Sequence, residues 1–159
     1  MNHLALLAFA TLALVSAGDD ALASSPADPV EKAIVAHVGN DHERALALLK
    51  ESVDINSGTM NIAGVRKVGS VFEREFKALG FNTHWIDGSS FNRAGHLVAS
   101  HGKLGPRVLL IGHLDTVFAE DSPFQKFMAI DANSARGPGT TDMKGGNVIM
   151  VSALRALRS

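Results

Sequence analysis

The chain has 159 residues, enough for one domain with a buried core. Its formal net charge of −1 at pH 7 gives no sign of a nucleic-acid-binding surface, and 46% hydrophobic with 19% charged residues argues against disorder. The sequence contains no cysteine, which excludes disulfides, a thiol nucleophile and a thiolate zinc site.

The N-terminus has the pattern of a signal peptide. An unbroken apolar or small-residue stretch runs from Leu4 to Val15, and Ala21-Leu22-Ala23 follows it. A stretch of this length is too short to span a bilayer, and Ala-x-Ala is a typical cleavage site. We therefore expect a signal peptide at 1–23 and a mature, periplasmic or secreted domain at 24–159, with no membrane contact after cleavage. Cleavage after Ala17 and a buried N-terminal helix are the alternatives.

Three helices are predicted in the first half of the mature chain. Residues 29–38 and 42–53 have helical patterns on either side of a Gly-Asn-Asp break, where Asp41 can cap the second helix. A third helix is predicted over 62–79, because apolar residues recur there at helical spacing and Asn61 can cap its start.

Short apolar segments predict strands after these helices. The segments are 81–86, 96–100 and 107–111, of which the last is expected to be central, while 127–135 could pair as a fourth strand. Helices that alternate with short strands predict an α/β protein with a three-layer α/β/α sandwich. In such sheets ligands gather beyond the carboxyl ends of the strands.

The first motif lies at the end of the expected central strand. The apolar run Val108–Gly112 is followed by His113-Leu114-Asp115, and residues two apart in an extended chain project to the same side. A metal-binding histidine usually donates its other N–H to a carboxylate or carbonyl group. The pair could therefore be a histidine ligand with its orienting carboxylate, or two ligands of one metal.

The second motif is a glycine-rich turn that presents one carboxylate. Asp142 lies within Gly137–Gly146, just before a segment with apolar residues at helical spacing from Val148 onward. A carboxylate held there could bridge two cations or cap the helix. A phosphate-binding loop is the rival interpretation, but the Gly-Lys-Ser/Thr pattern is missing and Asp142 would repel phosphate. Lys144 is expected to be a solvated or helix-start charge.

Together the two motifs resemble those of the co-catalytic zinc exopeptidases and deacylases, a family that includes glutamate carboxypeptidase and acetylornithine deacetylase. The resemblance implies that His113 binds one zinc ion, that Asp115 supports His113, and that Asp142 bridges two zinc ions. Residues 54–59 and 116–118 are similar to the glutamate carboxypeptidase branch.

This resemblance implies a zinc-dependent metallopeptidase that hydrolyses a C-terminal amide bond of a peptide or an N-acyl amino acid. The family completes its site with a Glu-Glu pair, a further acidic ligand and a distant histidine, and no position up to Ser159 matches them. We therefore expect the N-terminal part of a catalytic domain, inactive alone, with an open sheet edge and an exposed apolar face.

Two alternative functions stay open at this point. One is an N-acyl-amino-acid deacylase of the acetylornithine deacetylase type, and the other is a non-catalytic remnant that binds a partner through its open sheet edge. One histidine and two aspartates do not distinguish zinc from cobalt or manganese. The sequence does not predict an oligomeric state.

Overall fold

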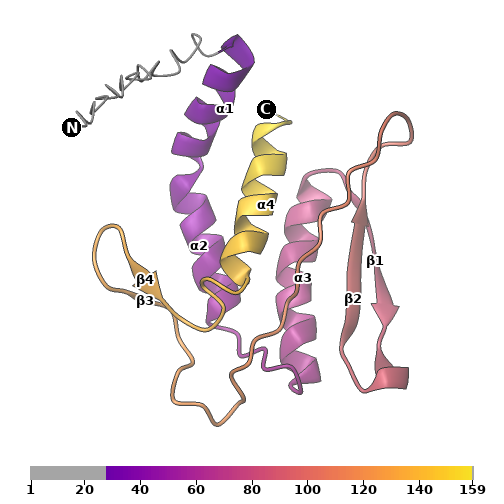
Figure 1. Ribbon diagram of the computed structural model, residues 1–159, viewed down its shortest axis with the longest axis vertical. Coiled ribbons are helices and arrows are strands. Elements are labelled where there is room, and N and C mark those ends of the chain that lie inside the picture. Colours follow the sequence, from indigo (N-terminus) through magenta and orange to yellow (C-terminus); the bar gives the residue numbers. More distant parts are fainter. Residues whose placement is uncertain (1–27, 159) are drawn as a thin grey trace, which may run out of the picture.

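The computed structural model describes residues 28–158 (Figure 1). The predicted signal peptide at 1–23 lies outside the described residues. In chain order the elements are α1 (Pro29–Asn40), α2 (His42–Val53), α3 (Ile62–Ala78), β1 (Asn82–Asp87), the 3-10 helix η1 (Ser89–Phe91), β2 (Gly95–Ser100), β3 (Met128–Ala129), β4 (Ala135–Arg136) and α4 (Lys144–Ala156). Among residues 28–158, no helix combines the length and the apolar character needed to cross a membrane.

The helix starts follow from local side-chain hydrogen bonds. At α1 the Asp28 carboxylate accepts from Val30 N at 2.7 Å while Glu31 accepts from Asp28 N at 3.1 Å, which together form a capping box. At α3 the Asn61 side chain accepts from Gly64 N at 2.9 Å, so this predicted cap is confirmed. Asp41 precedes α2 as predicted but makes no side-chain cap.

The hydrophobic core lies between helices α2, α3 and α4, which stand side by side in Figure 1. The buried residues of this cluster are Leu48, Val68, Val71, Phe72, Val148 and Val151. Removing each such side chain from water contributes roughly 1.5–3 kcal/mol to folding. The helical stripes predicted for α3 and α4 are therefore confirmed at these positions.

A small cluster of charges joins the helices beside this core. Arg155 of α4 contacts Asp41 and lies 2.9 Å from Glu75 on α3, and all three side chains are 9–10% exposed. Charges this deeply buried need partners, because an unpaired one would be strongly unfavourable. The side chain of Asp41 is thus committed to Arg155, which explains why it does not cap α2.

Strands β1 and β2 form an antiparallel hairpin against α3, in register from Asn82↔Ser100 to Asp87↔Gly95. The two strands follow the predicted segments closely. Trp85 donates its indole N–H to Ala94 O at 2.8 Å, and its ring lies over Gly69 of α3. A Cβ at Gly69 would approach Trp85 Cζ3 to 2.5 Å, so glycine is needed for the hairpin to pack this closely.

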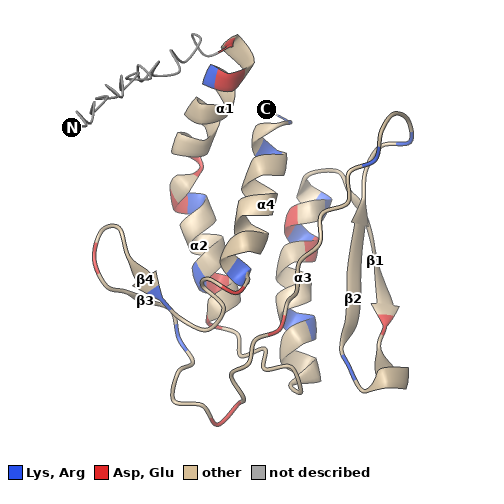
Figure 2. Ribbon diagram, in the orientation of Figure 1, with Lys and Arg blue, Asp and Glu red and all other residues tan. Residues whose placement is uncertain are grey.

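The prediction of a central strand at 107–111 is wrong for this structure. In the described part of the chain the segment pairs with no other strand, and Val108, Leu109 and Ile111 are 84%, 81% and 77% exposed. The sequence has no Lys, Arg, Asp or Glu between Arg107 and Asp115, and in Figure 2 a long stretch of the connection that passes α3 is tan. An apolar run forms a buried strand only when neighbouring strands cover it, and here the run is exposed apolar surface instead.

The prediction of a single strand at 127–135 is also wrong, because this region forms a small hairpin. β3 pairs with β4 antiparallel, with Met128 opposite Arg136. Asn133 N donates to the Asp131 carboxylate at 2.7 Å, a short-range bond typical of a tight turn. With four helices and two antiparallel sheets in the described residues, the α/β class is confirmed as a partial α/β domain.

Candidate active site

The three predicted site residues lie together. His113 Nε2 lies 2.8 Å from Asp142 Oδ1, although the two residues are 29 positions apart in the chain. His113 Nδ1 lies 3.3 Å from Asp115 Oδ1 and 3.0 Å from the backbone oxygen of the same residue. The imidazole is therefore held between the two carboxylates, one at each ring nitrogen.

Asp115 is itself held by a threonine that the sequence analysis did not single out. Thr59 Oγ1 donates to Asp115 Oδ2 at 2.5 Å. The backbones of the two segments run side by side, since Thr59 N donates to Thr116 O at 3.0 Å and Thr116 N to Ser57 O at 2.8 Å. Thr59, Asp115 and His113 thus form a chain of contacts. The available signal was that Thr59 lies in a stretch similar to the glutamate carboxypeptidase branch.

Helix α4 is fixed to the first motif by Asn147, which the sequence analysis also missed. Asn147 Nδ2 donates to His113 O at 2.7 Å. The helix comes so near that a Cβ at Gly112 would lie 2.3 Å from Asn147 Oδ1. Gly112 is therefore needed for this close approach, in addition to ending the apolar run.

Lys144 is buried, which corrects the expectation of a solvated charge. It does begin α4, but it is 0% exposed, and its Nζ donates to Ser52 O at 2.9 Å and to Ile55 O at 3.0 Å. Burial lowers the pKa of Lys144 to about 8, so the ammonium remains mostly protonated at pH 7. The two carbonyl acceptors explain how a cation is tolerated at this position.

The charge state of His113 follows from the same geometry. Partial burial acts against the imidazolium, but its hydrogen bond to the Asp142 carboxylate and its contacts with Asp115 outweigh burial and raise the pKa of His113 above its ordinary value. With Nδ1 facing Asp115, Nε2 is the nitrogen that faces Asp142 and the neighbouring cavity.

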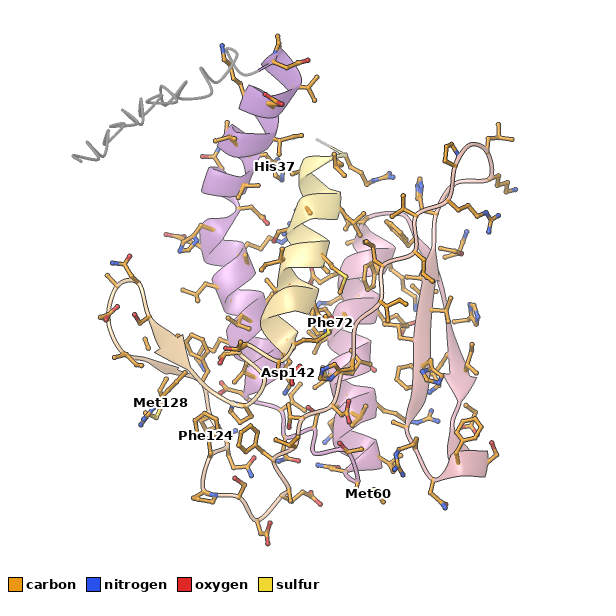
Figure 3. The ribbon with its side chains drawn as sticks, viewed as in Figure 1. His37, Met60, Phe72, Phe124, Met128 and Asp142 are labelled. Carbon is orange, nitrogen blue, oxygen red and sulfur yellow. The ribbon has the colours of Figure 1, made fainter. Side chains whose placement is uncertain are left out.

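An open cavity of about 400 Å³ lies beside these residues. The cavity is lined by the three site residues, by further polar and glycine residues, by an apolar wall and by one arginine. The lining residues are Thr59, His113, Asp115, Thr116, Val117, Phe118, Phe124, Arg136, Gly137, Gly139, Thr140, Thr141 and Asp142. The Phe118 and Phe124 rings meet edge to face, with centroids 5.0 Å apart. Figure 3 shows Asp142 at the start of α4. The volume suits a small molecule or the end of a peptide.

The donor atoms match part of a zinc site. An imidazole nitrogen and a carboxylate oxygen that face each other are ligand types that zinc accepts, and two such ligands on one tetrahedral zinc lie about 3.3 Å apart. The observed separation of 2.8 Å between Nε2 and Oδ1 needs only a small opening. Asp115 engages the opposite ring nitrogen, and within residues 28–158 no group of three or more His, Cys, Asp or Glu is arranged to hold a metal ion. The described residues thus fit two ligands of a zinc site, whereas three are usual.

Comparison with known proteins agrees with the motifs. Residues 109–159 match the model of peptidase family M20/M25/M40, and this region contains His113, Asp115 and Asp142. The predicted resemblance to this peptidase family is confirmed. The chain is also similar to carboxypeptidase G2 from Pseudomonas sp. (strain RS-16), with 28% identity over 120 residues. These cover 75% of the present chain and 29% of the relative, so the chain spans less than a third of that relative's length.

Proposed function

We propose that this chain forms the zinc-facing front part of the active site of a glutamate carboxypeptidase-like metallopeptidase. The observation that carries the proposal is the approach of His113 Nε2 to Asp142 Oδ1 at 2.8 Å, with Asp115 behind the imidazole, at the wall of a cavity of about 400 Å³. The family match over 109–159 and the similarity to a carboxypeptidase support it.

The proposed roles follow from which atoms face the cavity. His113 and Asp142 would hold zinc, Asp142 as the bridging ligand where two ions are bound, and Asp115 would keep the imidazole oriented through Nδ1. A zinc ion held there would polarise the substrate carbonyl and lower the pKa of a bound water. Thr59 restrains Asp115, and the Phe118–Phe124 pair provides an apolar wall of the cavity.

The substrate is proposed to be an amide bond next to a free carboxylate. Arg136 lines the same cavity and makes no ion pair within the part of the chain that the structure describes. A guanidinium in that position suits a carboxylate. With two facing ligands where three are usual, we expect the 159 residues to bind zinc weakly and to hydrolyse no substrate by themselves.

Zinc binding tests the proposal most directly. We would titrate the metal-free chain with zinc by calorimetry, and compare the wild type with H113A, D142N and the control H96A. His96 lies exposed on β2, away from the cavity. The proposal predicts measurable binding that both site variants weaken at least about tenfold and that H96A leaves unchanged. No binding by the wild type, or equal binding by H113A, would refute it.

Hydrolysis assays separate the candidate activities. A peptide with a C-terminal glutamate and N-acetylornithine would each be incubated with the zinc-loaded chain. We expect release of neither product. Glutamate release would support the proposed chemistry but refute the proposal that the 159 residues are inactive, while acetate release would favour the deacylase instead.

Export is a separate part of the proposal. The apolar N-terminus and the Ala21-Leu22-Ala23 site support cleavage after Ala23. Mass spectrometry of the protein made in a Gram-negative host should find Ser24 as the new N-terminus in the periplasmic fraction. An intact N-terminus in the cytoplasmic fraction would overturn this part alone.

A further inference from the structure

Lys144 is the most deeply buried charge near the candidate active site, and the proposed chemistry does not use it. Its side chain is 0% exposed and lies two residues after Asp142. The turn before α4 packs directly on the aliphatic stem, because a Cβ at Gly139 would lie 3.1 Å from both Cγ and Cδ of Lys144. Gly139 has φ +81°, and its backbone oxygen accepts from Lys144 N at 2.8 Å. The lysine therefore supports the turn from beneath.

The other end of the side chain reaches the end of a different helix. The ammonium donates to Ser52 O and Ile55 O, which lie in and just after the last turn of α2. Carbonyl groups at a helix C-terminus have no partner within the helix and carry the negative end of its dipole. A cation there stabilises α2 and at the same time joins it to the first residue of α4.

Asp142 needs such support because its own side chain is weakly held. The side chain is 83% exposed, and within the described residues its hydrogen bond to His113 is the one contact the carboxylate makes. The position of Oδ1 therefore depends on the backbone between Gly139 and Lys144. Lys144 is one end of that short segment, and at the other end Gly139 accepts a hydrogen bond from its backbone N–H and packs on its side chain.

We propose that Lys144 is a positioning residue for the metal site, whose buried ammonium holds the Asp142 turn against the end of α2 so that Asp142 Oδ1 faces His113. This inference rests on the proposed function, since it assigns Lys144 an effect on metal binding. It makes Lys144 neither a metal ligand nor a general base, because its Nζ is committed to two backbone carbonyls away from the cavity.

The chain offers a matched control. Lys126 also donates its ammonium to a carbonyl at the end of α2, with Nζ 2.9 Å from Asp54 O. This lysine is exposed, however, and it is 16 positions before Asp142 and not part of the turn. Substitution of Lys126 removes the same kind of bond at the same helix end, and leaves the support of the Asp142 turn in place.

The test measures the zinc affinity of the folded full chain by calorimetry, together with the visible spectrum of the cobalt-loaded chain, for K144M, K144R, K126M and D142N. Circular dichroism and thermal melts define a temperature at which each variant is folded. We expect K144M to bind zinc at least about tenfold more weakly than the wild type and to change the cobalt spectrum. K144R keeps the charge and donors and should stay within about threefold, as should K126M. If K144M does not fold, K144Q replaces it, with the same expected direction.

The outcomes separate this inference from the proposed function. A wild type that binds no zinc overturns both. Binding that D142N abolishes but folded K144M or K144Q leaves unchanged overturns only the positioning role, even if the melting temperature falls. Equal weakening by K126M also overturns it, because the effect would then belong to the end of α2 and not to the Asp142 turn.

Discussion

Arg155 of α4 connects separate helices through two carboxylates, and substitution with methionine tests how these helices are held together. One guanidinium nitrogen lies 2.9 Å from Glu75 Oε2 on α3, and another contacts Asp41 at the start of α2. The three side chains are 9–10% exposed. Methionine keeps a long aliphatic side chain, so R155M removes the charge and its hydrogen bonds while most of the packing stays.

The expected loss follows from what each carboxylate retains. Glu75 keeps Arg44 and Arg74, each with a guanidinium nitrogen 3.2 Å from one of its oxygens. In the described residues, Asp41 keeps only the Ser152 hydroxyl, at 3.4 Å. R155M therefore leaves one buried carboxylate nearly unpaired, which costs roughly 3 kcal/mol of unfolding free energy. For a chain of this size, such a loss lowers the melting temperature by roughly 10 °C.

Urea unfolding at pH 7 of the wild type, R155M, D41N, the double variant and R158M measures this effect. Arg158 is exposed and contacts the exposed His101, so R158M should change the unfolding free energy by less than about 0.5 kcal/mol. D41N alone should lower the unfolding free energy. In the R155M background it should instead raise the unfolding free energy by about 1 kcal/mol, because it removes the unpaired charge. A loss below about 1 kcal/mol in R155M, or additive losses in the double variant, would refute the reasoning.

Three further predictions concern other parts of the chain. Partial burial opposes ionisation of Asp54, but a lysine ion pair and a backbone N–H lower its pKa below the ordinary 3.8. The wild type should therefore have a larger unfolding free energy than D54N, by an amount that is constant above pH 3.8 and vanishes as the pH falls through the pKa of the folded state. T59V removes the hydroxyl that holds Asp115 and should weaken zinc binding about tenfold in a calorimetric titration. V108S/I111S should reduce dye binding and light scattering without a loss in unfolding free energy, because the two side chains are 84% and 77% exposed.

Each of these has a control or a contrary outcome. A difference in unfolding free energy between the wild type and D54N that persists at pH 2 would contradict the assigned role of the carboxylate. T83V is the control for T59V, since Thr83 donates to Glu73 on the far side of α3; equal zinc affinities of both variants would mean that the Asp115 contact does not matter. Loss of stability in V108S/I111S would mean that the apolar segment is covered in solution.

The helices and the site motifs could be predicted because their signals are local. The helical repeat of apolar residues and the asparagine at 61 are short-range features, and α2 begins and ends where the pattern predicted, at His42 and Val53. The pair His113 and Asp115 is likewise local, since two residues apart in extended backbone face the same way. Its approach to Asp142 came from the family resemblance, because no spacing rule connects positions 29 residues apart.

Thr59 and Lys144 could not be predicted in the same way, because their roles depend on partners that are far away in the chain. Thr59 acts on a carboxylate 56 positions later, and the Lys144 ammonium reaches backbone carbonyls 92 and 89 positions earlier. Backbone acceptors leave no side-chain signature in the sequence. A lysine at a helix start is usually exposed, and this one is buried because its stem packs on the Gly139 turn and its ammonium reaches the end of α2.

The segment 107–111 shows how far the composition of a strand determines its structure. Its residues favour a buried strand, but strand formation requires hydrogen-bonding neighbours, and burial requires layers on both faces. Here the downstream residue Thr116 finds a partner in the bridge to Gly58, while the apolar residues before His113 find none among residues 28–158. His113 is therefore positioned by Asp115, Asp142 and Asn147 rather than by a sheet. Because the two aspartates hold both ring nitrogens and Asn147 holds the backbone oxygen of His113, the candidate site can keep its geometry where the strand before it is unpaired.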